Sequence, residues 1–492
     1  MAALLNSNLA AQQNIMLKHQ WNFPGVDGYR FPIVANNIPR YIFDSKNNNY
    51  REPTAVFLYE FIKKIFNADF TIIRSSFTPT LTPSNERTYY NNFLNALEQI
   101  NRESNRQKIS FITYDYRIKN AADYGTPAVL ERIYDSRYCY GISVDEPKES
   151  EFSYFANWSQ KFSTDDTNSW FNKKLFYVNI FGASAVRNYE SYVSQWITLA
   201  KPRVLSYDNY PVWDDVQASK FNDEINSDWT NDFYYNLEIF RQKSVETNIP
   251  FWNWILVHKH WSSYSHRYYR RAKESDIRLQ VYASLAYGCK GILYYNFWNP
   301  PLAINNNGWH EENAVLDALG NETDLYPVIA TLNREILSIG DILLQLTSRG
   351  TYHGSTKYDS GKLTEKMFSS KNTNGFSRYG IKEINTQDSI LSEKERQFKI
   401  VKNINNNAAL IGIFEHQKLP NIFMIVVNKN RLKEEKFFIE LDETKFLSSM
   451  KQIIIKNLSE NGKQFPVVNM NGKYGFWLTI NAGSGKLLEF TK

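Results

Sequence analysis

The chain has 492 residues, of which 42% are hydrophobic and 22% charged, so it is a globular chain long enough for two or three domains. The net charge of +6 is spread over 57 basic residues without a Lys/Arg block, which argues against a nucleic-acid-binding tract. The sequence contains no run of 18 apolar residues, so it predicts no membrane span. Aromatic residues make up 15%, a share that suits both sugar-stacking proteins and aromatic-rich cores.

Residues 1–20 are polar, and we expect them to be a flexible N-terminus. They lack a charged segment followed by an apolar core, so no secretion signal is visible. The location is therefore left open between two cases: extracytoplasmic (periplasmic, surface or secreted) if a signal was removed, and cytoplasmic otherwise. The two cysteines, Cys139 and Cys289, both lie at apolar segments, and we expect two buried free thiols without a disulfide or a zinc site.

From residue 21 to 345, strand-like and helix-like segments alternate. The predicted strands are residues 39–44, 69–74, 108–115, 138–145, 174–180, 203–211, 249–257 and 290–298. The predicted helices are residues 54–66, 86–102, 127–134, 149–162, 189–200, 228–246, 274–288 and 325–339. Eight such pairs predict an α/β fold of the (β/α)₈ TIM-barrel type. The rival, an open doubly wound sheet, is less favoured because no Gly-rich phosphate loop follows the first strand.

The pattern changes after residue 345. Residues 346–400 are polar and are expected to be an irregular linker with one or two strands. Residues 401–492 contain short alternating runs at 409–414, 422–427, 436–441, 452–455, 474–480 and 486–490. Turns such as Asn461-Gly462 and Asn471-Gly472 separate some of them. This pattern predicts a small C-terminal all-β sandwich.

Polar and aromatic side chains stand at the ends of the predicted barrel strands. The strand over residues 138–145 runs directly into Asp145, Glu146 and Pro147, and core packing explains two adjacent acids poorly. The carboxyl ends of parallel barrel strands meet at one face, where active sites form. Other strand ends add Asp44, Arg74, Asp115, Arg117, Asn179, Asp208, Tyr210, Trp252, Trp254, His258, His260 and Trp298.

Paired carboxylates with aromatic walls suit glycosidic cleavage, in which one acid protonates the leaving oxygen and another attacks the sugar or activates water. Each residue also has a structural interpretation. Asp145 could hold a loop, Asp208 could form a turn, Asp115 and Arg117 could be an ion pair, and the tryptophans could fill the barrel. His258 and His260 lie two residues apart, but a third metal ligand is not apparent, so we expect no metal and no cofactor.

The run Asp145-Glu146-Pro147 after a strand resembles the Asn-Glu-Pro signature of the clan A glycoside hydrolases, (β/α)₈ enzymes in which the Glu is the acid/base. Four further runs resemble uncharacterised β-galactosidase-like hydrolases of gut and marine Bacteroidetes, and they cover residues 206–211, 249–252, 279–288 and 291–295. Members of that group tend to end in a small β-sandwich. The resemblance spans about residues 40–345 and implies a poly- or oligosaccharide substrate, with Glu146 as the general acid.

Two departures from that family matter. Asp145 stands where the clan has an Asn that contacts the sugar, and the strand at 251–257 ends without the clan's nucleophilic Glu. The second carboxylate must therefore come from elsewhere, with Asp208 the leading candidate and Asp115 or Asp44 behind it. Strands four and six also carry the catalytic residues in α-galactosidase-like barrels.

The resulting hypothesis is a glycoside hydrolase with Glu146 and Asp208 as its catalytic pair. The residues expected to bind sugar are Asp145, Asp115, Arg117, Asn179, Tyr210, Trp252, Trp254, His258, His260 and Trp298. Two alternatives stay open. One is a carbohydrate-binding protein on a degenerate barrel, which the missing strand-seven Glu favours. The other is a polysaccharide lyase with Tyr210 or His258 as its base. The sequence does not indicate the oligomeric state.

Overall fold

The structure is a computed structural model of the whole chain. It describes residues 30–39, 42–44, 49–77, 83–104, 108–115, 118, 136–163, 174–183, 185–186, 188–212, 231–262, 267–299, 314–354, 382–384, 386–406, 408–445 and 453–491. The expected flexible N-terminus and the predicted helix at 127–134 lie outside these residues. The described residues group into two compact units, each built from three segments of the chain.

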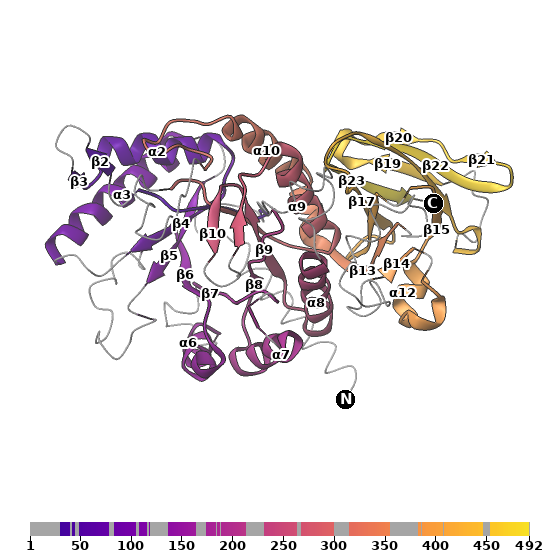
Figure 1. Ribbon diagram of the computed structural model, residues 1–492, viewed down its shortest axis with the longest axis horizontal. Helices are drawn as coiled ribbons and strands as arrows, with labels where there is room; N and C mark the ends of the chain where they lie inside the picture. Colours follow the sequence, from indigo (N-terminus) through magenta and orange to yellow (C-terminus); the bar gives the residue numbers. More distant parts are fainter. Residues whose placement is uncertain are drawn as a thin grey trace. The chain divides into compact units, whose positions relative to one another are not determined.

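The first unit is built on an eight-stranded sheet of parallel strands (Figure 1). Its strands, in chain order, are β1 (Ile33–Asn36), β4 (Ile72–Phe77), β5 (Ser110–Asp115), β6 (Cys139–Asp145), β7 (Leu175–Asn179), β8 (Leu205–Tyr207), β9 (Phe251–Leu256) and β12 (Ile292–Tyr295). Neighbours in the chain are neighbours in the sheet, and β1 pairs with β12 through Ile33 and Ile292. A parallel bridge between Ile180 and Tyr207 joins β7 to β8 and closes the ring. The predicted TIM barrel is therefore confirmed.

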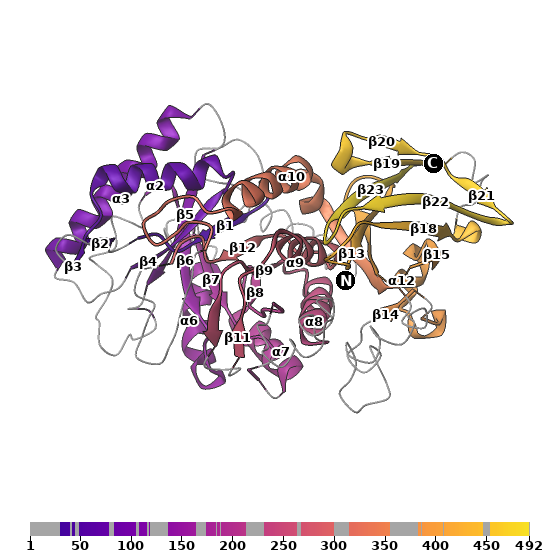
Figure 2. The same cartoon turned by 45° about the horizontal axis from the view of Figure 1, so that its top comes forward.

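Helices separate the strands along the chain, and α2, α3, α6 and α7 lie outside the ring of strands (Figures 1 and 2). Their bounds are α2 (Ala55–Asn67), α3 (Pro83–Glu103), α6 (Phe152–Ser163) and α7 (Tyr189–Ala200), and α10 (Leu325–Gln345) follows the last strand. The side chain of Thr54 caps α2 by accepting a hydrogen bond from the Phe57 amide. The helices turn apolar side chains such as Leu58 and Ile62 inward and bury them.

The first predicted strand was placed wrongly. Ile42–Asp44 forms β2, which pairs antiparallel with β3 (Asn49–Arg51) in a separate hairpin. The first barrel strand is β1, a run of four buried residues that ends on Asn36 rather than on an acid. Asp44 is therefore not at the end of a barrel strand, and its side chain lies outside the described part of the structure.

The second unit contains two β-sheets at the C-terminal end of the chain. One sheet has the order β14-β13-β16-β17-β23-β19-β20 and the other β15-β18-β22-β21. Their strands are β13 (Leu346–His353), β14 (Lys382–Glu383), β15 (Val401–Ile404), β16 (Ala409–His416), β17 (Ile422–Asn428), β18 (Glu435–Leu441), β19 (Ile454–Asn457), β20 (Lys463–Phe465), β21 (Val468–Met470), β22 (Lys473–Ile480) and β23 (Gly485–Thr491). Buried residues of both sheets, such as Met424 and Phe476, form one core, as in a β-sandwich.

The β-sandwich starts earlier in the chain than its predicted boundary at residue 401. Leu346–His353, which falls in the predicted linker, is β13 and pairs antiparallel with β16 over its whole length. The turn at Asn471-Gly472 is confirmed as a two-residue hairpin between β21 and β22, with both residues at positive φ.

Two helices that follow barrel strands in the chain also belong to the second unit. These are α8 (Asn231–Thr247) and α9 (Glu274–Ala286). The carboxylate of Asp276 on α9 pairs with Arg270 at 2.7 Å and with Arg431 at 2.8 Å. A Cβ atom at Gly412 of β16 would lie 2.0 Å from the carbonyl oxygen of Ala286, so β16 approaches the end of α9 closely enough to require glycine. Helix α9 is thus part of the same packed body as the sandwich.

The two cysteines are confirmed as buried free thiols, and burial raises the pKa of Cys139 to about 11. None of the helices in the described part of the chain combines the length and apolarity that a bilayer crossing needs.

Candidate active site at the carboxyl ends of the barrel strands

A network of polar side chains covers the carboxyl ends of the strands in the first unit. Arg74 on β4 is its centre, because its guanidinium donates to three neighbours on two other strands. It donates to Asn36 Oδ1 at 2.9 Å, to Ser143 Oγ at 3.2 Å and to Asp145 Oδ2 at 3.0 Å. The side chain of Arg74 is only 5% exposed, whereas that of Asp145 is 36% exposed. Arg74 thus holds a carboxylate that solvent still reaches.

Two aromatic rings lie next to the Arg74 guanidinium. Its Cζ lies 5.3 Å from the ring centre of Tyr114 and 5.2 Å from that of Trp254. Such cation–π contacts are favourable where the cation is shielded from water. The ring of Trp254 is buried and packs against Arg74, so this residue has a structural contact at the site.

Asn179, at the end of β7, connects two carboxylates. Its Nδ2 donates to Asp145 Oδ1 at 3.1 Å and to Asp208 Oδ1 at 2.8 Å. The two accepting oxygens therefore lie no farther apart than the sum of these distances, about 6 Å. Acids from the fourth and the sixth strand of the barrel thus meet at one place.

Glu146 follows β6 and turns the chain out of the sheet. Its φ of 48° lies in the left-handed region, and its amide donates to the carbonyl oxygen of Asn179 at 2.8 Å. A non-glycine residue in this conformation carries backbone strain, a feature that clusters at functional sites. Burial raises the pKa of Tyr192 above its usual range, and the charges of Glu146 and Asp208 act in the same direction. The Tyr192 hydroxyl donates to the carbonyl oxygen of Pro147, the residue after Glu146, at 2.9 Å.

The seventh strand contributes no acid to this edge. His258 follows β9, is fully buried, and accepts a hydrogen bond at Nδ1 from the Asn296 amide at 3.0 Å. Burial lowers the pKa of His258 to about 4, so its imidazole is neutral at ordinary pH. Asn296 also bonds to Asn36 and, through its Nδ2, to Asn299 Oδ1 at 2.8 Å. This amide group links the ends of β12 and β1.

The structure brings together only some of the predicted site residues. Asp145, Asn179, Asp208 and Trp254 join the network directly, and the backbone amide of Glu146 bonds to Asn179. Trp252 and Trp298 are buried, with exposed fractions of 0% and 4%, which is typical of core residues. Tyr210 belongs to the second unit, where its ring lies edge-on to Tyr269. Arg117 and the side chains of Asp115 and His260 lie outside the described residues.

Several residues of this network were not predicted as site residues. Asn36 was missed because the first strand was misplaced, and Arg74 was noted at a strand end but not included among the expected sugar-binding residues. Ser143, Tyr177, Ser206 and Asn296 lie within or directly after strands, where sequence pattern alone does not separate them from core residues. Asn36 ends an apolar run, a signal that could have identified it.

No group of three or more His, Cys, Asp or Glu side chains among the described residues is arranged to hold a metal ion.

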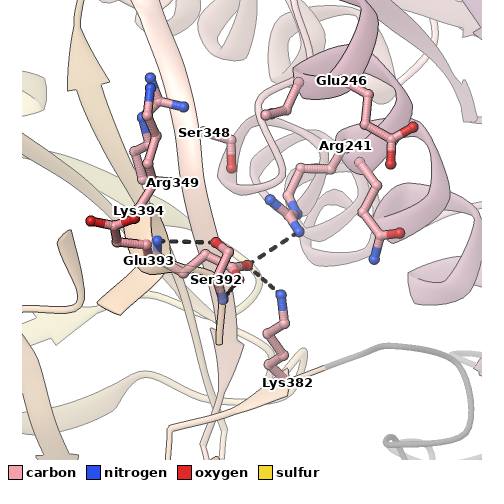
Figure 3. Close-up of a pocket in the computed structure, with 11 residues that line it drawn as sticks. Arg241, Glu246, Ser348, Arg349, Lys382, Ser392, Glu393 and Lys394 are labelled. Carbon is pink, nitrogen blue, oxygen red and sulfur yellow. Dashed lines mark hydrogen bonds and ion pairs between the residues drawn. The ribbon is translucent and has the colours of Figure 1, made fainter. Parts of the chain in front are cut away.

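The second unit contains a cavity of about 490 Å³ (Figure 3). Some of its charged lining residues are already held in ion pairs. Arg241 forms two hydrogen bonds with Glu238 and an ion pair of 3.7 Å with Glu395, and Lys382 binds Glu395 as well. Glu395 is thus flanked by two cations and is an acid already engaged within the unit.

The comparisons with known proteins are distant. No protein-family model and no curated protein matches the chain. Among solved structures, an α-amylase from Geobacillus thermoleovorans complexed with acarbose is 9% identical with a TM-score of 0.49, over 94% of this chain and 98% of that chain. A gamma-CGTase from alkalophilic Bacillus clarkii is 10% identical with a TM-score of 0.45, over 93% and 70%. A β-galactosidase from Marinomonas ef1 is 9% identical with a TM-score of 0.40, over 64% and 62%.

With TM-scores below 0.5, these likenesses carry no argument about the chemistry of this chain. The barrel is assigned from the strand order of this chain, and any proposal of function depends on the geometry of the site.

Proposed function

We propose that the chain is a glycoside hydrolase that cleaves a poly- or oligosaccharide with two carboxylates at the ends of β6 and β8. The observation that supports this most strongly is the single Asn179 amide that donates to both Asp145 and Asp208. Glycosidic cleavage needs two acids placed on either side of one bond, and the carboxyl edge of a barrel is where they would converge.

In this proposal Glu146 is the general acid and Asp208 the nucleophile or base. Asp145, held at both oxygens by Arg74 and Asn179, binds and orients the sugar. The contacts of Asp145 also support a second assignment, in which Asp145 rather than Glu146 is the catalytic partner of Asp208. The two assignments differ in which β6 acid the reaction requires.

The experiment is a screen of the purified protein against plant, algal, host and bacterial glycans, with released reducing ends as the readout. Glu146→Gln, Asp145→Asn and Asp208→Asn are tested beside it. The matched control is Glu190→Gln, which removes an exposed acid in the first turn of α7. Product formed by the wild type and the control, and lost in Asp208→Asn, supports the proposal. Loss in only one of the two β6 variants chooses the assignment.

The alternative of a carbohydrate-binding protein is favoured by one observation, the buried neutral His258 where an acid would be expected at the end of β9. Binding to a glycan without any product would support it. A lyase receives little support, because both residues expected to serve as its base, Tyr210 and His258, are buried. A lyase product would absorb in the near ultraviolet, whereas a hydrolase product would not.

A further inference from the structure

A chain of hydrogen bonds runs through the barrel interior to Asn179. Trp254 Nε1 donates to the Tyr177 hydroxyl at 2.9 Å, and the Tyr177 and Ser206 hydroxyl oxygens lie 2.5 Å apart. Ser206 Oγ then donates to Asn179 Oδ1 at 3.1 Å. All four side chains are almost completely buried, with exposed fractions of 2% or less.

The direction of this chain is fixed by which groups can only donate. An indole N–H has no acceptor capacity, so the Tyr177 oxygen must accept from Trp254. The single Ser206 proton goes to Asn179 Oδ1, which as an amide oxygen can only accept. Tyr177 must therefore donate its proton to Ser206. In this arrangement every hydroxyl proton in the chain is used once.

The orientation of the Asn179 amide follows from the carboxylates of Asp145 and Asp208, which can only accept, so the NH₂ group faces them and donates to each. Oδ1 then faces Ser206 and accepts its proton. A flipped amide would present its oxygen to two carboxylates and would lose the hydrogen bond from Ser206 to Oδ1. We propose that Trp254, Tyr177 and Ser206 are positioning residues that fix the Asn179 amide so that it holds Asp145 and Asp208 together.

Trp254 acts on Asp145 from a second side. Its ring lies against the Arg74 guanidinium, which binds Asp145 Oδ2, while its indole N–H starts the chain that ends at Asp145 Oδ1. One buried tryptophan thus helps to place both oxygens of one carboxylate. This inference deepens the proposed function and rests on it for its catalytic consequence, but its geometric part can be tested without any activity.

The test is Tyr177→Phe, which removes one oxygen from the middle of the chain. The matched control is Tyr294→Phe, because the buried Tyr294 hydroxyl donates to Asn333 Oδ1 at 3.0 Å, and Asn333 Nδ2 donates to the carbonyl oxygen of Ala68 at 2.8 Å. Both variants delete a buried tyrosine hydroxyl that orients a buried asparagine, but only one of these asparagines touches the carboxylates.

Two readouts are combined: crystal structures of the variants, and kcat and KM on the substrate found by the screen. In Tyr177→Phe we expect Asp145 and Asp208 to lose their common donor, with kcat reduced by roughly 10- to 100-fold and KM within about twofold, since a displacement of about 1 Å in a catalytic group has an effect of this size. Tyr294→Phe should keep the bridge and the wild-type kcat.

An Asn179 bridge that survives in Tyr177→Phe, with kcat unchanged, would overturn the inference. If Tyr177→Phe does not fold, Ser206→Ala breaks the chain with a smaller deletion and should lose the Asn179 bridge. Ser206→Thr keeps the hydroxyl and should keep the bridge. A bridge that survives in Ser206→Ala, or is lost in Ser206→Thr, would equally overturn the inference. If the wild type cleaves no glycan, the proposed function fails, while the crystal structures still decide whether these residues position the pair.

Discussion

The Arg74 guanidinium lies 3.0 Å from the Asp145 carboxylate and joins the second strand of the barrel to the fourth. Between these two strands in the sheet lies β5, so the ion pair spans the interior of the ring rather than two adjacent strands. Such a pair holds a carboxylate at the barrel mouth while leaving one side of it open to solvent.

Replacement of Arg74 should therefore damage both the fold and the site. Arg74→Met leaves Asp145, Asn36 and Ser143 without their common donor, and we expect a loss of about 2–4 kcal/mol in the free energy of unfolding. Arg74→Lys should also be impaired, because a lysine cannot reproduce three directed bonds and two ring contacts. Urea denaturation measures the effect. Arg334→Met, which removes a 62% exposed arginine 3.8 Å from Asp69, should cost less than about 0.5 kcal/mol.

Buried His258 should make stability depend on pH in the acidic range. Its pKa is about 4 in the folded protein and about 6.5 in an unfolded chain, so the unfolded state binds the extra proton between these values. The His258 contribution is fully present above about pH 6.5 and is lost as the pH falls toward about 4, by at most roughly 3 kcal/mol. Chemical denaturation at several pH values should show this slope.

The variant His258→Gln should reduce that slope without abolishing it, because burial also lowers the pKa of His353 and gives the same sign. An unchanged slope in His258→Gln would show that the imidazole is not buried as described.

Gly141 on β6 should not tolerate a side chain. A Cβ atom at Gly141 of β6 would lie 2.0 Å from the carbonyl oxygen of Leu175 on β7, and a backbone group cannot move aside cheaply. We expect Gly141→Ala to cost about 1–3 kcal/mol or more and to move Asp145 away from Asn179. Gly462→Ala is the control, because nothing lies within 4 Å of its Cβ and only its φ of +75° opposes the change, by about 1 kcal/mol. Thermal unfolding of both variants separates the steric contact at Gly141 from the backbone strain at Gly462. Equal losses of stability in the two variants would contradict the close contact at Gly141.

The acid at the start of α9 should be essential to the second unit. Asp276 is 2% exposed and neutralises both Arg270 and Arg431, so Asp276→Asn leaves two guanidinium groups without their charge partner. We expect a loss of about 3–5 kcal/mol. Despite burial, hydrogen bonds and charges from these arginines lower the pKa of Asp276, so its contribution is present at neutral pH and lost in acid.

Glu274→Gln is the matched control for that experiment. It changes a 54% exposed acid in the same helical turn, paired only with Arg278 at 2.7 Å, and should cost less than about 1 kcal/mol. A similar loss in both variants would mean that the Asp276 cluster is no stronger than a surface pair.

Sequence pattern predicted the barrel because short apolar runs alternate with helix-like stretches along the chain, and that information is local. It misplaced the first strand because Ile33–Asn36 is short and lacks an acid, whereas residues 39–44 end on one. It placed Asp145, Asn179 and Asp208 at strand ends, but it could not show that one amide joins them. The partners of Arg74 lie 38 to 71 residues away, and such pairing depends on the closure of the ring.

The same limit explains why the sequence could not assign roles to the tryptophans. Trp252 and Trp254 alternate along β9, and alternation does not state whether a ring faces a ligand or another side chain. The structure gives Trp254 a hydrogen bond to Tyr177 and a cation beside its ring, which only the neighbouring strands could supply.

The assembly of each unit from three chain segments has a consequence for biosynthesis. Helix α9 leaves the ribosome long before the strands that cover it, and Asp276 meets Arg431 only after 155 further residues have been made. Until β16, β17 and β23 have been made, α9 lacks the strands that pack against it, so the second unit cannot complete its packing. Folding of this unit is therefore expected to finish only once β23 is available, with a high contact order and a correspondingly slow rate.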